Sequence, residues 1–194
     1  NTIWPHRSYI SSKILCDGVR LYDYACTSEF RGADGEEMCG IGTFCHEFGH
    51  VLGLPDLYDT NYQYYTVGYW DIMCSGSYNN YGNTPPTYSA YERFFLGWLS
   101  PKQLTEKGQY SLESLQEANQ AYLIAEGEHN LVGSHPTPEE FFLLEYRPKT
   151  GWDSYLPGSG MLVWHIDYLA SAWYSNTPNN GPNFLFFESN FSFL

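Results

Sequence analysis

Residues 46–56 carry the pattern that most constrains this chain, H-E-x-x-H-x-x-G-x-x-D. His46 and His50 are four residues apart, so on a helix both imidazole rings lie on one face and can bind one metal ion. Glu47 lies beside them, where its carboxylate can accept a proton from a water molecule that the metal activates. The pattern therefore predicts a helix that carries two metal ligands and a general base.

The apolar residues around this motif support a helix from about Cys39 to Leu52. At about 100° per residue, five apolar side chains fall within roughly 120° of arc, and the two histidines fall on nearly the opposite side. These five residues are Ile41, Phe44, Phe48, Val51 and Leu52. The expectation is a helix with an apolar face in the core and a metal-binding face opposite.

Gly53 and Pro55 predict how a third ligand reaches the metal. A glycine just past the last apolar turn can adopt the left-handed conformation that ends a helix, and proline prevents the helix from resuming. The chain is then free to bend and bring Asp56 towards the two histidines. Three protein ligands leave one position open, as in catalytic zinc sites. Asp59 is a competing candidate ligand in the same loop.

A second motif follows at residues 70–78, WDIMCSGSY, with LGW at residues 96–98. Together with HEFGHVLGLPDLYD, these residues resemble the metzincin zinc peptidases and, within them, the secreted bacterial metalloproteases of the immune-inhibitor-A type. The resemblance implies a zinc endopeptidase in which Met73 forms the Met-turn beneath the metal. It also implies that Tyr78 stabilises the transition state. One departure is Leu57, where relatives carry an acidic residue.

Other readings of these residues remain open. In a gluzincin-like peptidase, the third ligand would be Glu92, on a helix predicted from Tyr88 to Trp98 after Pro85 and Pro86. A different class is an extracellular binding or adhesion module without catalytic activity, with the tyrosines as its contact surface. His165 and Asp167 share one face of a predicted strand, which is typical of a solvated sheet and less often of a second metal site.

Composition sets the broad class. The chain has 194 residues, with 43% hydrophobic and 19% aromatic residues, and a net charge of −13. This charge argues against nucleic-acid partners and anionic membranes, and no apolar run is long enough to span a bilayer. The chain begins with Asn1 and has no signal peptide. We therefore expect part of a longer secreted protein, with a prosegment or further domains, acting on protein or peptide substrates.

The five cysteines form no C-x-x-C pair, so a structural zinc knuckle is not expected. Cys16 and Cys26 flank a predicted hairpin around Asp17 and Gly18, where a disulfide is plausible. Cys45 is predicted to be a buried thiol. The remaining cysteines are Cys39 and Cys74. Zinc is the expected cofactor, and calcium is considered as a further ion.

From about residue 102 the periodicity changes from 3.6 to 2, which predicts strands. The predicted strands are Gln109–Glu113, Ala121–Ala125, Phe141–Tyr146 and Gly160–Asp167. The expected fold is therefore α+β. A zinc-peptidase catalytic portion would cover residues 1–103, and a β-rich, sandwich-like unit would cover residues 104–194. The apolar tail at residues 184–194 is expected to cover a neighbouring surface.

Overall fold

The computed structural model describes residues 3–32 and 35–181, so the apolar tail at residues 184–194 lies outside the described residues. The strands are β1 (His6–Cys16), β2 (Val19–Cys26), β3 (Phe30–Arg31), β4 (Glu37–Met38), β5 (Lys102–Gln103), β6 (Tyr122–Ala125), β7 (Glu140–Arg147) and β8 (Gly160–Asp167). The α-helices are α1 (Ile41–Val51), α2 (Ala90–Phe95), α3 (Leu115–Ala118) and α4 (Ala170–Tyr174). Short 3₁₀ helices span Gly68–Trp70, Ser75–Gly82 and Gly151–Tyr155. The mixed α/β class is as predicted.

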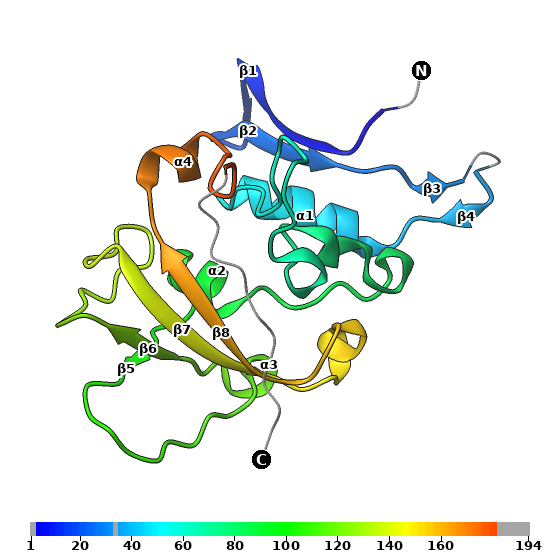
Figure 1. Cartoon of the computed structure of the whole chain (residues 1–194). Helices are drawn as coiled ribbons and strands as arrows, with labels where there is room; N and C mark the ends of the chain where they lie inside the picture. The colour runs from blue at the N-terminus through cyan, green and yellow to red at the C-terminus, as the bar shows by residue number, and fades with distance from the viewer. Residues whose placement is uncertain (1–2, 33–34, 182–194) are drawn as a thin grey trace.

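Strands β1 and β2 form an antiparallel hairpin that lies beside α1 (Figure 1). Asp17 and Gly18 form its turn, both at positive φ, as a two-residue type I′ connection requires. Cys16 pairs with Val19 next to the turn, whereas Cys26 pairs with His6 at the open end. The two thiols therefore lie at opposite ends of the hairpin, and the predicted Cys16–Cys26 disulfide is wrong. All five cysteines have free thiols.

Strands β3 and β4 pair in a second short hairpin, and the third sheet has the strand order β5-β6-β7-β8. In it β5 is parallel to β6, and the other pairs are antiparallel. Three of the four predicted strands match β6, β7 and β8. The predicted strand Gln109–Glu113 is wrong, because these residues form no strand and only neighbouring Ser114 makes a single bridge, to Tyr146. Within the described residues this unit contains one four-stranded sheet, and α2 and α3 contact its strand β7. The predicted sandwich is not confirmed.

Helix α2 is shorter than the predicted Tyr88–Trp98 because both of its ends are fixed locally. Ser89 caps its start, and Ser89 and Glu92 form a reciprocal capping box. Its last turn closes at Leu96, and Gly97 follows in the left-handed region at φ +72. These two signals hold the helix to Ala90–Phe95.

Helix α1 begins and ends close to its predicted limits, but its burial differs from the prediction. Ile41, Phe44 and Phe48 are 47%, 41% and 44% exposed. The buried positions on this helix are instead Gly42, Glu47 and Gly49. The prediction of an apolar face turned into the core is therefore wrong for the described part of the chain.

Glycine explains this difference. A Cβ atom on Gly42 would lie 1.9 Å from the carbonyl oxygen of Ser77, and one on Gly49 would lie 2.4 Å from the sulfur of Met73. The helix thus packs closely against the segment 71–82 through positions that have no side chain. Periodicity counts apolar side chains, so it cannot detect contacts of this kind.

One hydrophobic core joins the chain on both sides of residue 103. It contains Met73 from the segment after α1, Tyr91 and Phe94 from α2, and Leu123 and Phe141 from the sheet. Helix α4 adds Trp173, which packs edge-on to Tyr91. The unit that carries α1 and the four-stranded sheet therefore share buried side chains.

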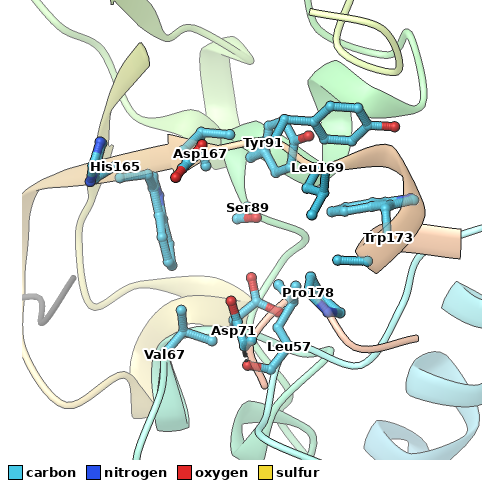
Figure 2. Close-up of a pocket in the computed structure, with 15 residues that line it drawn as sticks. Leu57, Val67, Asp71, Ser89, Tyr91, His165, Asp167, Leu169, Trp173 and Pro178 are labelled. Atoms are coloured by element: carbon cyan, nitrogen blue, oxygen red, sulfur yellow. Dashed lines mark hydrogen bonds between the residues drawn. The ribbon is translucent and has the colours of Figure 1, made fainter. Parts of the chain in front are cut away.

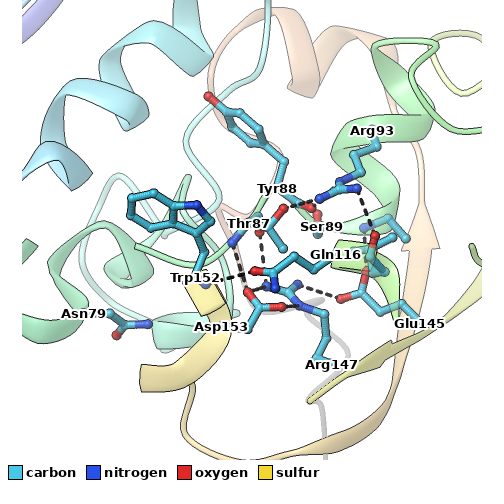
Figure 3. A network of polar contacts seen from close by, with 12 residues as sticks. Asn79, Thr87, Tyr88, Ser89, Arg93, Gln116, Glu145, Arg147, Trp152 and Asp153 are labelled. Carbon is cyan, nitrogen blue, oxygen red and sulfur yellow. Dashed lines mark hydrogen bonds and ion pairs between the residues drawn. The ribbon is translucent and has the colours of Figure 1, made fainter. Parts of the chain in front are cut away.

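A buried ion network ties β7 to the start of α2 (Figure 3). Arg147 contacts Glu145 at 2.9 Å and Asp153 at 2.6 Å and 2.7 Å, and all three side chains are buried. The carboxylates also accept backbone N–H groups at the start of α2, Asp153 from Thr87 and Glu145 from Ala90. Burial alone would lower the pKa of Arg147, but Glu145 and Asp153 raise it above its usual value.

Across the described residues the longest α-helix has 11 residues, and no helix is long and apolar enough to cross a membrane.

Candidate metal centre

His46, His50 and Asp56 come together at one end of α1. One potential ligand atom from each lies within 4.8 Å of the others. The Oδ1 atom of Asp56 lies 3.1 Å from Nε2 of His46 and 3.2 Å from Nε2 of His50. Among the described residues, these three side chains form the one group of His, Cys, Asp or Glu that could hold a metal ion. It is the set of three that the sequence predicts.

The helix terminus brings Asp56 to this position. Gly53 has φ +99, its N–H donates to the His50 carbonyl, and the Leu54 N–H donates to the Gly49 carbonyl. This is the Schellman arrangement, in which a left-handed residue ends the helix and reverses the chain. Pro55 follows, and the next residue is Asp56. The predicted bend at Gly53 is present.

Backbone carbonyls orient both histidine rings. The Nδ1 atom of His46 lies 2.9 Å from the Ile72 carbonyl, and that of His50 lies 2.8 Å from the Leu54 carbonyl. A carbonyl oxygen only accepts hydrogen bonds, so each Nδ1 carries the proton. In the neutral rings, the Nε2 lone pairs then face Asp56 Oδ1. This is the arrangement of metal-binding histidines whose tautomer is fixed by a second partner.

The charges of the three groups depend on one another. Burial alone would lower the pKa of His46, but Asp56 and the Ile72 carbonyl outweigh it and raise this pKa above its usual value. Burial alone would raise the pKa of Asp56, but the adjacent His46 and His50 rings and the hydrogen bond from Asn176 hold it well below its usual range. Asp56 is therefore ionised. A carboxylate and two nitrogen lone pairs that converge favour a cation between them.

Glu47 is buried, and together with His46 it lines two cavities. The first has a volume of ≈ 540 Å³, and the second has a volume of ≈ 670 Å³. Both are lined by His46, Glu47 and Tyr58, and by Trp4 and Pro5 from the N-terminal segment. A carboxylate that lines two open spaces can reach a ligand that occupies both.

Two tyrosines complete the surroundings. Tyr58 stacks on His46, with ring centroids 6.5 Å apart and an interplanar angle of 19°. Tyr78 lines the larger cavity together with Glu47. Partial burial raises the pKa of Tyr78, and the nearby charges of Glu47 and Asp56 add to this effect. The Tyr78 phenol is therefore neutral and can donate a hydrogen bond into the cavity.

Met73 lies at the centre of the segment that follows. It is fully buried, and its sulfur lies against Gly49 of α1. Its N–H donates to the Asp71 carboxylate, and its carbonyl accepts the N–H of Leu57, next to Asp56. The preceding residue, Ile72, holds His46. The turn around Met73 thus contacts the helix, the ligand loop and one histidine.

Substitutions of Met73 should separate packing from metal binding. Met73→Leu conserves volume and apolarity, so we expect a loss of less than about 1.5 kcal/mol, with metal retained. Met73→Ala leaves a cavity at a fully buried position and should cost about 2–5 kcal/mol. Thermal melts and metal content of both variants measure this. Loss of metal in the Leu variant, or a wild-type melt of the Ala variant, would contradict the packing role.

The other predicted candidates have different partners. The Asp59 carboxylate accepts the N–H groups of Asn61, Gln63 and Tyr64, so it shapes its own loop. Glu92 is fully buried in the capping box of α2, and burial together with Asp71 raises its pKa well above the usual value. His165 lies 2.9 Å from Glu140.

Sequence reasoning missed two contributors to this centre. Tyr58 follows Asp56 by two residues, and its position in the ligand loop is a weak local signal. Asn176 hydrogen-bonds both the backbone and the side chain of Asp56 across 120 residues. No local pattern could have revealed that contact.

The amino-acid sequence was compared with known proteins. Residues 1–99 match the family model described as immune inhibitor A peptidase M6, catalytic domain. A pre-pro-metalloprotease PrtV of Vibrio cholerae is 43% identical over 119 residues, which cover 54% of this chain and 13% of that protein. Immune inhibitor A of Bacillus thuringiensis is 30% identical over 112 residues, which cover 50% of this chain and 15% of that protein.

The family-model match, residues 1–99, includes His46, His50, Asp56 and the segment around Met73. The regions matched in the two curated relatives are short. They span about one seventh of the length of the curated relatives. The matching family model covers half of this chain and describes a catalytic domain. The chain belongs to the immune inhibitor A peptidase M6 family.

Proposed function

We propose that this chain is the zinc-binding part of a secreted metalloendopeptidase that hydrolyses peptide bonds in proteins. The observation that carries the proposal is the convergence of His46 Nε2, His50 Nε2 and Asp56 Oδ1, with both Nδ1 atoms held by carbonyls. Secretion is supported by the resemblance to secreted relatives and by the pre-pro form named for the Vibrio protein, since such leaders direct export.

The donor set favours zinc. Two imidazole nitrogens and one carboxylate oxygen are ligands that catalytic zinc uses, with a fourth position left open. Calcium binds six to eight oxygen atoms, so these three residues do not suit it, and a calcium ion would require another site. When bound, zinc would supply Lewis-acid polarisation of the scissile carbonyl and would activate a water molecule.

The chain's own residues would carry the proton transfers and position the substrate. Glu47, which lines both cavities, would accept a proton from the attacking water and return it to the leaving amine. Tyr78 would donate a hydrogen bond to the oxygen that becomes negative in the transition state. An extended peptide would pass Glu47, with residues on either side of the scissile bond in the two cavities.

The alternatives have less support. A gluzincin-like centre needs Glu92 as a ligand, whereas its carboxylate is bound to Ser89 inside the core. A binding module without activity needs neither a buried carboxylate that lines two cavities nor oriented histidine rings. Activity measurements decide between this class and a peptidase.

The test combines metal analysis with a peptidase assay. We expect one zinc per chain, and casein digestion that a chelator abolishes. Replacing His46 and His50 with alanine should remove the zinc, because each supplies one of three ligands. Asp56→Ala should weaken zinc binding more than Glu92→Ala, as a competing chelator would report. Unchanged zinc in the double histidine variant would refute the site, and a larger effect at Glu92 would favour the gluzincin-like centre.

A further inference from the structure

The chain returns to the metal centre after β8. Helix α4 lies near the end of α1 (Figure 1), and residues 173–180, here called the returning segment, run beside the loop that carries Asp56. Each contact joins residues about 120 positions apart in the sequence. Trp173 Nε1 donates to the Gly53 carbonyl at 3.3 Å, and Asn179 Nδ2 donates to the Leu57 carbonyl at 2.6 Å. Asn180 accepts the Thr60 N–H at 2.9 Å and donates to the Thr60 hydroxyl at 2.6 Å. The fourth contact joins Asn176 to Asp56.

Asn176 makes the most specific of these contacts. Its Oδ1 accepts the Asp56 N–H at 2.6 Å, and its Nδ2 donates to Asp56 Oδ2 at 2.7 Å. The other carboxylate oxygen, Oδ1, is buried and has no hydrogen-bond donor among the described residues. That oxygen is the one that faces both histidine Nε2 atoms. One oxygen is thus held by the protein, and the other is left for a cation.

The backbone at Asn176 suits a side chain that holds the Asp56 carboxylate. Asn176 has φ +60, a left-handed conformation that asparagine and glycine adopt more readily than other residues. Its N–H donates to the Trp173 carbonyl at the end of α4. Asn176 itself is exposed, whereas Asp56 is buried. Removing the Asn176 side chain would therefore delete two hydrogen bonds without opening a cavity in the core.

Packing behind the ligand loop is incomplete. A cavity of ≈ 110 Å³ separates this loop from the sheet (Figure 2). Leu57, Asp71 and Pro178 lie on one side of it, and Tyr91 and Leu169 lie on the other. Leu57 packs against the core next to this cavity, so the ligand loop is held both by apolar packing and by the hydrogen bonds of the returning segment.

We propose that Asn176 is a positioning residue for the metal ligand Asp56. By holding Oδ2, it presents Oδ1 alone to the metal and so favours binding through one oxygen. The zinc centre is then built from two distant parts of the chain, the α1 region and the segment after the four-stranded sheet. This inference rests on the proposed zinc site.

The experiment measures zinc affinity of the whole chain by competition with a chelator. Asn176→Gly removes the side chain and keeps the left-handed backbone. We expect its zinc affinity to fall about 10–100-fold, the usual loss when a group that orients a metal ligand is removed. The matched control is Asn179→Ala, which removes a hydrogen bond from the same segment to the same loop but not to Asp56. Its zinc affinity should change less than threefold or so, well below the loss typical of an orienting group.

Two further readouts separate positioning from folding. The thermal melt of zinc-free Asn176→Gly should remain cooperative and fall by only a few degrees, since two part-buried hydrogen bonds are lost and no core side chain is removed. The visible spectrum with cobalt(II) in place of zinc should change in Asn176→Gly and not in Asn179→Ala, because the freed carboxylate can bind through both oxygens. Wild-type zinc affinity and an unchanged cobalt spectrum in Asn176→Gly would overturn the inference alone. A wild-type chain that binds no zinc would overturn the proposed function as well.

Discussion

Glu47→Gln is expected to keep its zinc and to lose about 10²–10⁴-fold in kcat, the usual contribution of a general base. The amide has the shape of the carboxylate but cannot accept the proton of the attacking water. Glu47 is buried beside the two cavities and is not one of the three converging ligands, so metal binding should survive the substitution. Turnover of a quenched peptide and the zinc content of the same sample measure both effects.

A matched control is Glu140→Gln on strand β7. This substitution also exchanges one carboxylate for an amide, but its side chain is exposed and pairs with His165 on the sheet. We expect wild-type turnover from it. Equal turnover of Glu47→Gln and the wild type would reject the general-base role, whereas loss of zinc in Glu47→Gln would assign this residue to metal binding.

Arg147→Met is expected to lower the free energy of unfolding by about 3–5 kcal/mol, because it leaves buried charges without their partner. Glu145 and Asp153 would keep their backbone hydrogen bonds but lose the guanidinium between them. For a chain of this size the melting temperature should fall by roughly 6–20 °C, at about 2–4 °C per kcal/mol. Urea unfolding and thermal melts measure this loss.

Arg7→Met serves as the control for the loss of a charge pair. Arg7 contacts Asp23 across the β1–β2 hairpin, and both side chains are partly exposed. Such pairs contribute about 0–1 kcal/mol, so this variant should melt close to the wild type. Similar melts of Arg147→Met and Arg7→Met would show that the buried network does not hold β7 to α2.

The metal-centre geometry could be predicted where it is local in sequence. The spacing of His46 and His50 fixes their common face once the helix forms, and Gly53 determines where that helix ends. Asp56 follows Gly53 by only three residues, so the backbone between them can adopt few conformations. The three candidate ligands follow from these constraints alone.

The features that the sequence did not predict depend on contacts that leave no periodic pattern in it. Gly42 and Gly49 bury one side of α1 by close backbone approach, which leaves Phe44 and Phe48 exposed. In the second unit, residues 109–113 alternate like a strand, but no neighbouring strand pairs with them. Asn176 reaches Asp56 only because β8 and α4 carry the chain back to α1.

The separation between Asp56 and Asn176 has a consequence for the order in which the chain folds. Contacts that close a loop of this length form late, since the entropy of closure must be overcome before the contact contributes. Until the sheet and α4 have folded, the chain holds both histidines and the aspartate, but Asn176 is not yet in place to hold the carboxylate. Tight metal uptake would then coincide with the docking of α4, so metal binding would report that this part of the chain has finished folding.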